Sequence, residues 1–141
     1  MKAIASMFLA GAAAVATGAY GLQNVRASYH EYVPKAVTTP LVQAPLSGAP
    51  GQIAVIKRLE MEPGWVGGRH FHTGDVFVYV VEGSIVFTLD GKAPMTLEAG
   101  EMLHELPNQV MSVANASSTE PLKIILFQVN DDGKPLMIKA D

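Results

Sequence analysis

The stretch that decides the fold runs from Gly64 to Gly83 and reads GWVGGRHFHTGDVFVYVVEG. It places two histidines, His70 and His72, one residue apart and just ahead of an apolar run at residues 76–81. Side chains alternate between the two faces of a β-strand, so residues two apart point the same way. The two imidazoles therefore lie on one face, and such a pair is half of a transition-metal site.

Short extended segments separated by turn residues lie on both sides of this stretch. Residues 52–61 alternate, with Ile53, Val55, Lys57 and Leu59 on one face, and the pair Asp90-Gly91 is a strong hairpin signal. No segment shows a sustained helical period. Many short strands with turns about every 8–12 residues are typical of a β-sandwich or a small barrel. The sequence therefore predicts an all-β fold.

Length and composition predict one domain and exclude several classes of function. A chain of 141 residues suits a single domain, and 49% apolar residues are enough for one core. The chain contains no cysteine, which excludes disulfides, zinc-thiolate sites and thiol catalysis. A net charge of -3 and a pI near 5.8 give no basic surface for nucleic acid. We therefore expect no nucleic-acid partner.

Residues 1–27 are typical of a secretory signal sequence. A lysine at the start is followed by an alanine-rich apolar run and then by small residues. Cleavage after Ala19 or after Ala27 fits the small-residue rule, and we favour the second site. The alternative is an uncleaved membrane anchor, but the run at residues 3–19 is short and weakly hydrophobic for a span. We expect a mature chain that begins at Ser28, is periplasmic or extracellular, and has no membrane contact after cleavage.

The spacing around the histidine pair resembles the motifs of the cupin superfamily. The matching residues are Gly64, His70, His72 and Gly83 for the first motif, and Gly100 and Asn115 for the two ends of the second. The resemblance runs from Val42 to Val129 and implies a single-domain jelly-roll β-barrel. We place the barrel at residues 41–130, after an irregular segment at 28–40 that contains two prolines and before a C-terminal tail at 131–141.

The resemblance also implies a metal site of three histidines and one carboxylate, and two of these four positions are changed. Val76 occupies the glutamate position, and Met111 occupies the position of the third histidine. A thioether suits Cu(I), but methionine inside a barrel is more often an adaptable apolar filler. We therefore expect Val76, Val78 and Met111 to line a cavity that is more apolar than that of the family.

A third metal ligand has three candidates. Asp75 precedes Val76, so it faces outward unless a β-bulge turns it inward. His104 and Glu105 are adjacent, so one of them faces the interior and the other does not. The amphipathic pattern favours His104, whereas the family pattern favours Glu105. Both remain open, and we take Glu105 as the third candidate ligand beside the two motif histidines.

These features allow three kinds of function. The first is an exported single-domain cupin that binds a small molecule in its barrel, together with a weakly held divalent metal (Fe, Mn, Ni, Cu or Zn) at His70, His72 and Glu105. The second is a metal-dependent cupin enzyme, a dioxygenase or isomerase acting on a small organic substrate. The third is a structural protein that oligomerises through its strand edges, and a homodimer is compatible with the sequence. The two changed ligand positions favour the first.

Overall fold

The structure, a computed structural model, describes residues 35–141. The expected signal sequence at residues 1–27 and most of the irregular segment at 28–40 lie outside these residues. The described part contains ten β-strands and no helix, so none of its elements is an apolar helix of membrane-spanning length. The strands are β1 (Val37–Pro45), β2 (Gln52–Met61), β3 (His70–His72), β4 (Asp75–Glu82), β5 (Ser84–Leu89), β6 (Met95–Glu98), β7 (Met102–Glu105), β8 (Met111–Asn115), β9 (Leu122–Asp131) and β10 (Met137–Lys139).

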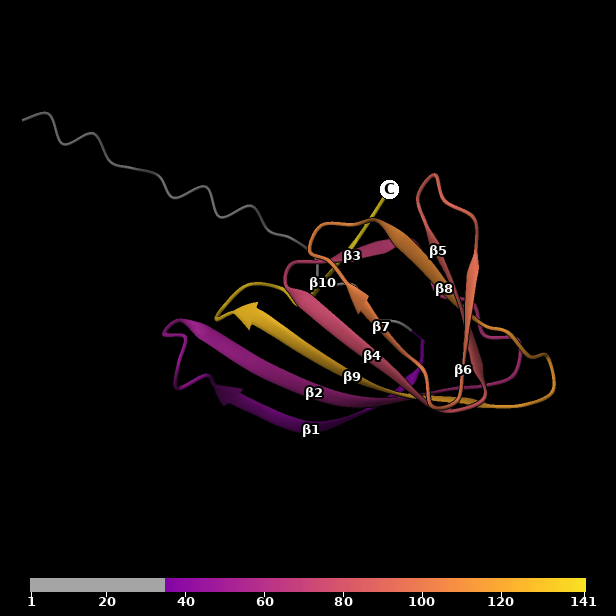
Figure 1. The fold of residues 1–141 in the computed structure, drawn as a ribbon, viewed down its shortest axis with the longest axis horizontal. Coiled ribbons are helices and arrows are strands. Elements are labelled where there is room, and N and C mark those ends of the chain that lie inside the picture. The colour runs from indigo at the N-terminus through magenta and orange to yellow at the C-terminus, as the bar shows by residue number, and fades with distance from the viewer. Residues whose placement is uncertain (1–34) are drawn as a thin grey trace, which may run out of the picture.

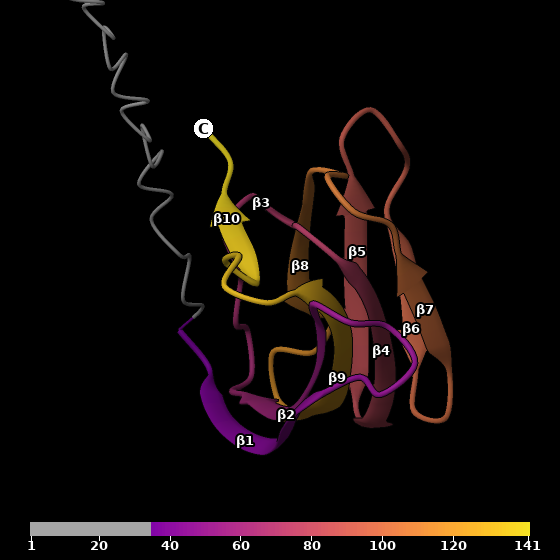
Figure 2. The same ribbon diagram turned by 90° about the vertical axis from the view of Figure 1, so that its left-hand side faces the viewer.

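The strands form two five-stranded antiparallel sheets that lie against each other (Figures 1 and 2). The strand order is β1-β2-β9-β4-β7 in one sheet and β10-β3-β8-β5-β6 in the other. The chain passes between the sheets several times, as from β4 to β5, so each sheet combines strands that are far apart in sequence. This arrangement confirms the predicted all-β fold with antiparallel sheets.

Alternation along each strand builds the core between the two sheets. In β4, Val76, Val78 and Val80 are each at most 2% exposed, whereas Tyr79 lies on the outer face. Ile85 and Phe87 of β5 belong to the same buried cluster from the opposite sheet. Burying an aliphatic side chain of this size stabilises the fold by roughly 1.5–3 kcal/mol. The apolar run after the histidine pair therefore anchors the strand that carries one wall of the barrel.

The barrel extends further in both directions than residues 41–130. β1 begins at Val37, inside the segment that we expected to be irregular, and pairs with β2. Pro40 is tolerated there because β1 is an edge strand, where a proline need not donate to a neighbour, and the register shifts between Pro40 and Val42. β10 lies in the expected C-terminal tail and pairs with β3. The expected irregular segment therefore contains the start of a strand, the expected C-terminal tail contains another, and the expected barrel limits at residues 41 and 130 were wrong.

Two motif glycines have clear structural reasons. Gly83 joins β4 to β5 with a φ of 80°, a conformation that costs glycine little, and a Cβ there would lie 2.5 Å from the Pro121 carbonyl oxygen. Gly100 has a φ of 92° in the turn between β6 and β7. These positions fit the resemblance because both turns need a residue without a Cβ.

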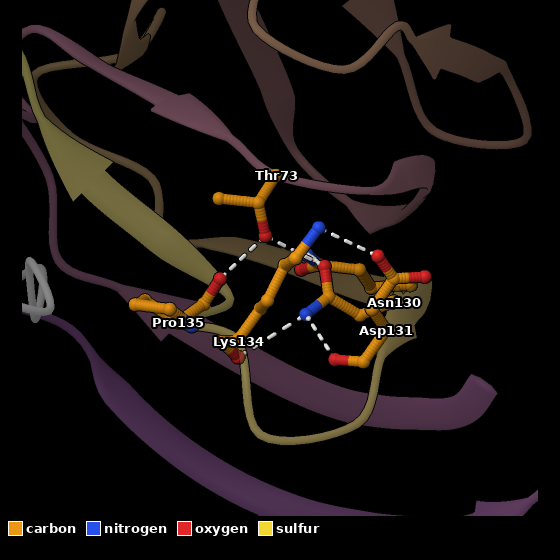
Figure 3. A network of polar contacts seen from close by, with 6 residues as sticks. Thr73, Asn130, Asp131, Lys134 and Pro135 are labelled. Carbon is orange, nitrogen blue, oxygen red and sulfur yellow. Dashed lines mark hydrogen bonds and ion pairs between the residues drawn. The ribbon is translucent and has the colours of Figure 1, made fainter. Parts of the chain in front are cut away.

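A polar network holds the turn between β9 and β10 against the barrel (Figure 3). Thr73 Oγ1 contacts both Asn130 Oδ1 and the Pro135 carbonyl oxygen. Asn130 Nδ2 donates to the carbonyl oxygens of Asp131 and Lys134 at 3.1 and 3.2 Å. Asn130 is 2% exposed, so these bonds are shielded from water. They fix the C-terminal segment across one end of the barrel.

Candidate functional site

The two sheets enclose a cavity of about 150 Å³ between them. Its walls are mainly apolar, and a few polar side chains also line it. The apolar lining includes Leu59, Met61, Trp65, Val78, Ile85, Phe87, Val113, Ile124 and Leu126. The polar lining comprises Lys57, His70, His72, Glu105 and Gln128, together with Thr38 of the edge strand β1. This is the combination expected of a small-molecule site, an apolar pocket with a few convergent polar groups.

Strand register explains why these polar residues face inward. His70 and His72 lie on one face of β3 and are 5% and 4% exposed, and their rings meet edge to face with centroids 5.2 Å apart. Glu105 pairs with Val76, and Val76 pairs with Gln128 on the next strand. Directly opposed residues of paired strands share a face of the sheet. Glu105 and Gln128 therefore project to the same inner face as Val76.

The structure resolves the choice between His104 and Glu105. Glu105 is 4% exposed and lines the cavity, whereas His104 lies on the outer surface. There His104 Nε2 is 2.8 Å from Asp75 Oδ1, and its ring stacks on Phe77 with centroids 4.4 Å apart. Asp75 thus faces outward, as strand alternation predicted. Whether Glu105 binds a metal stays a prediction.

Backbone carbonyls set the tautomers of both cavity histidines. His70 Nδ1 lies 2.8 Å from the Gly68 carbonyl oxygen, and His72 Nδ1 lies 3.1 Å from that of Leu136. A carbonyl oxygen only accepts, so in each neutral ring Nδ1 carries the proton and Nε2 presents its lone pair. Gln128 Nε2 donates to the same Leu136 carbonyl at 2.8 Å. The C-terminal segment therefore orients His72 and Gln128 together.

Burial favours the uncharged forms of the titratable groups in the cavity. It lowers the pKa of His72 to about 4, with smaller contributions from the charges of His70 and Lys57, and it also lowers the pKa of His70. It raises the pKa of Glu105 to about 8. At neutral pH the two imidazoles are therefore uncharged, and Glu105 is mostly a neutral acid that can donate a hydrogen bond.

The Glu105 carboxyl group is the polar group with an unmet hydrogen bond. Its Oε2 atom is buried and makes no hydrogen bond with the described residues. His72 Nε2 lies 3.4 Å from this oxygen, a contact that is too long for a good hydrogen bond. A buried polar atom without a partner costs about 1–3 kcal/mol. A ligand with a polar atom at this point would remove that cost.

The donor types suit a transition metal, but their arrangement does not form a complete site. Two Nε2 lone pairs and one carboxyl group face the cavity. However, within residues 35–141 no group of three or more His, Asp or Glu side chains converges closely enough to hold a metal ion. A protein metal site normally needs three or four ligands. The residues present do not fit a resident metal as they stand.

Two of the three expected lining residues lie elsewhere in the core. Val78 lines the cavity as predicted. Val76 and Met111 do point inward, but both are 0% exposed and neither contributes to the cavity wall. The reason is that neighbouring side chains cover them completely. They are buried core residues at the two positions where the resemblance implies ligands, as expected if Met111 is an apolar filler.

Three cavity residues were missed as site residues. Lys57 shares the inner face with Leu59, and alternation along residues 52–61 indicated this orientation. Gln128 lies in β9, a largely apolar strand, and no motif in the sequence marked it as a site residue. Trp65 lies in the loop before the histidine pair. It is 8% exposed and lines the cavity, and its Nε1 donates to the Lys35 carbonyl oxygen at 2.5 Å.

Solved structures with the same fold include several cupins. A cupin 2 domain-containing protein from Halorhodospira halophila is 23% identical, with a TM-score of 0.60 over 75% of this chain and 70% of that chain. A cupin-like protein from Thermotoga maritima is 21% identical, with a TM-score of 0.61 over 74% and 75%. The DMSP lyase DddQ from Ruegeria pomeroyi is 15% identical, with a TM-score of 0.58 over 74% and 51%. At these identities the similarity shows the fold alone.

No curated protein is similar enough to match the chain. The family model described as a cupin domain matches residues 57–128, just over half of the sequence. The matched region starts at Lys57 in β2, ends at Gln128 in β9, and contains the histidine pair and Glu105. Sequence match, barrel topology and structural neighbours agree, and the chain therefore belongs to the cupin domain family.

Proposed function

We propose that the protein binds a small, mostly apolar molecule with one polar group inside its barrel. The observation that carries this proposal is the cavity of about 150 Å³, which has an apolar wall and a buried carboxyl oxygen that no described residue bonds. An apolar protein cavity of about this volume holds a molecule the size of benzene. The body of the ligand is therefore a single ring or a short chain.

The polar residues determine what the rest of the ligand can be. The neutral Glu105 acid can donate a hydrogen bond, and the Nε2 lone pair of His72 can accept one. A hydroxyl, carbonyl or carboxyl group on the ligand would pair with them, whereas a purely apolar molecule would leave Oε2 without a partner. A few polar groups at fixed positions in an apolar pocket determine which ligands bind, so we expect the cavity to recognise one chemical class of ligand.

Trp65 supplies a direct binding assay. It is the only tryptophan of the chain and lines the cavity, so a ligand that enters should change its fluorescence. We expect benzyl alcohol or benzoate to give a saturable change in emission and to raise the melting temperature. Val78→Phe should fill the cavity and abolish the response, whereas Val81→Phe, at a 47% exposed position in the same strand, should retain it. An unchanged response in Val78→Phe would place binding outside the barrel.

A second candidate function is a metal-dependent cupin enzyme acting on a small organic molecule. It is favoured by two imidazoles whose Nδ1 atoms are fixed by carbonyls, as is common for metal-binding histidines, and by the unbonded Glu105 carboxyl oxygen. A bound metal would supply Lewis-acid or oxygen-activating chemistry. The chain itself would contribute His70, His72 and Glu105 as ligands, although these three side chains do not converge on one point in the structure.

Metal analysis of protein purified without chelator tests this alternative. If the site binds metal, a divalent metal should bind weakly, and its affinity should fall as the pH drops below about 8, because Glu105 must lose its proton to act as a ligand. His70→Ala and His72→Ala should each abolish binding, with His104→Ala, on the outer surface, as the matched control. Equal metal content in the double alanine variant would exclude this site.

We also propose that the protein is exported and that the mature chain begins at Ser28. The support is the order of charged, apolar and small residues at positions 1–27. Intact mass spectrometry of the native protein, combined with cell fractionation, measures both properties. Soluble protein that retains Lys2 would contradict cleavage.

A further inference from the structure

A lysine faces the inside of the barrel. Lys57 lies in the middle of β2, opposite Leu126 of β9, and on the same face as Leu59. Leu59 and Leu126 both line the cavity, and so does Lys57. Among the described residues Lys57 forms no hydrogen bond and no ion pair, although the outward-facing Arg58 beside it pairs with Glu60. An anion that entered the cavity would therefore meet a positive charge that no described side chain neutralises.

Lys57 also lines a second, outer pocket of about 560 Å³. This pocket lies between the start of β2 and the turn that joins β9 to β10, the segment held by the network in Figure 3. Leu136, like Lys57, lines both the barrel cavity and the outer pocket. Lys57 therefore lies at the boundary between the apolar cavity and a wider, more open pocket.

The other charged residues of the outer pocket do not compete with Lys57 for an anion. Lys134 lies at the surface, where its Nζ pairs with Asp131 Oδ2 at 2.7 Å. Asp132 is exposed on the same turn and carries a negative charge. Glu105, the acid in the barrel cavity, forms no ion pair with Lys57. Lys57 is thus the cation in the described lining that lacks a counter-ion.

We propose that Lys57 binds the carboxylate of the ligand, which is a small monocarboxylate with an aromatic or short aliphatic body. This inference rests on the proposed function and specifies the polar group of that ligand. The apolar body would occupy the barrel cavity. The carboxylate, on the side that adjoins the outer pocket, would accept hydrogen bonds from Lys57 and from the neutral Glu105 acid, which both line that cavity. A single lysine supplies one positive charge as a compact point, which matches one negative charge. A phosphate dianion would bring a second charge without a partner.

Paired probes with the same body test the proposal. We would compare benzoate with benzyl alcohol at pH 7, using Trp65 fluorescence and calorimetry. Wild-type protein should bind benzoate about ten-fold or more tightly than benzyl alcohol. In Lys57→Met this preference should disappear, while the affinity for benzyl alcohol changes little because the aliphatic stem is kept. Lys134→Met is the matched control, since it removes a lysine that lines the outer pocket alone. It should retain the preference.

Each outcome separates this inference from the function on which it rests. If benzyl alcohol binds and benzoate binds no more tightly, the role of Lys57 is wrong and the proposed function stands. If neither probe binds, both are wrong. A preference for benzoate that survives in Lys57→Met, or a tighter binding of phenyl phosphate than of benzoate, also overturns the inference. Should Lys57→Met fail to fold, Lys57→Gln provides the same comparison, with the preference again expected to disappear.

Discussion

Replacing Glu105 by glutamine should remove a pH dependence from the folding stability of this protein. Burial raises the pKa of Glu105 from 4.5 to about 8, so the folded protein keeps a proton that the unfolded chain has lost. Stability falls with rising pH wherever the folded state binds more protons. The contribution of Glu105 is therefore complete below pH 4.5, declines between pH 4.5 and 8, and is lost above pH 8.

The two cavity histidines change the folding stability with pH in the opposite direction to Glu105. Burial lowers the pKa of His72 from 6.5 to about 4, so between these values the unfolded chain holds the extra proton and stability rises with pH. The change at His70 has the same direction. From pH 4.5 to 6.5 the contribution of His72 largely cancels that of Glu105, and His70 adds a net rise of stability with pH. From pH 6.5 to 8 Glu105 acts without that opposition, and at about 1.4 kcal/mol per pH unit its loss amounts to about 2 kcal/mol.

Urea unfolding at a series of pH values, with chelator present, measures the effect. Wild-type stability should fall by about 2 kcal/mol between pH 6.5 and 8. In Glu105→Gln, whose glutamine side chain is neutral at every pH, this decline should vanish, and the rise between pH 4 and 6.5 should become steeper because the histidines are no longer opposed. Glu62→Gln removes an exposed carboxylate and is the control, since its curve should follow wild type. Parallel curves for wild type and Glu105→Gln would refute the reasoning.

Four further substitutions, in three experiments, test the packing and the changed ligand positions. Gly74→Ala would place a Cβ 2.0 Å from the Val129 carbonyl oxygen, so it should lower the free energy of unfolding by about 1–3 kcal/mol or more in a denaturant titration. Asn115→Ala removes hydrogen bonds to three backbone groups and should cost about 1–3 kcal/mol by the same assay, with near-wild-type stability contradicting its role. Val76→Glu with Met111→His should raise metal affinity by several kcal/mol in calorimetry, whereas Val76→Glu alone should destabilise the metal-free protein; if neither gains metal, the family alignment at these positions is wrong.

Local rules in the sequence were enough to predict the fold and part of the site. Strand alternation placed His70 and His72 on one face, and turn signals separated the strands, because both effects act over a few residues. The edges of the barrel could not be predicted in this way. Pro40 indicated an irregular segment, but an edge strand accepts proline, and which strand lies at an edge depends on the pairing of the whole sheet.

Cavity walls required information that the sequence did not contain. Val76 and Val78 share one face of β4, yet only Val78 lines the cavity. Their difference depends on which side chains of other strands cover each of them. The same limit applied to the choice between His104 and Glu105. Their strand has only four residues, which is too short for the alternation of polar and apolar residues to show which of the two faces inward. The register of β7 against β4 decides it.

That register also suggests how this cavity differs from a complete cupin site. Glu105 lies directly opposite Val76, the position where the resemblance implies a glutamate. A carboxyl group is therefore present on the neighbouring strand and on the same inner face, one strand away from the expected place. It approaches His72 to 3.4 Å, while the third histidine position holds a fully buried methionine. The acid is thus retained next to the histidine pair while the ligand set is reduced, and burial keeps both acid and imidazole uncharged. Such a neutral pair is suited to exchange hydrogen bonds with an organic ligand, which is why we favour small-molecule binding over a resident metal.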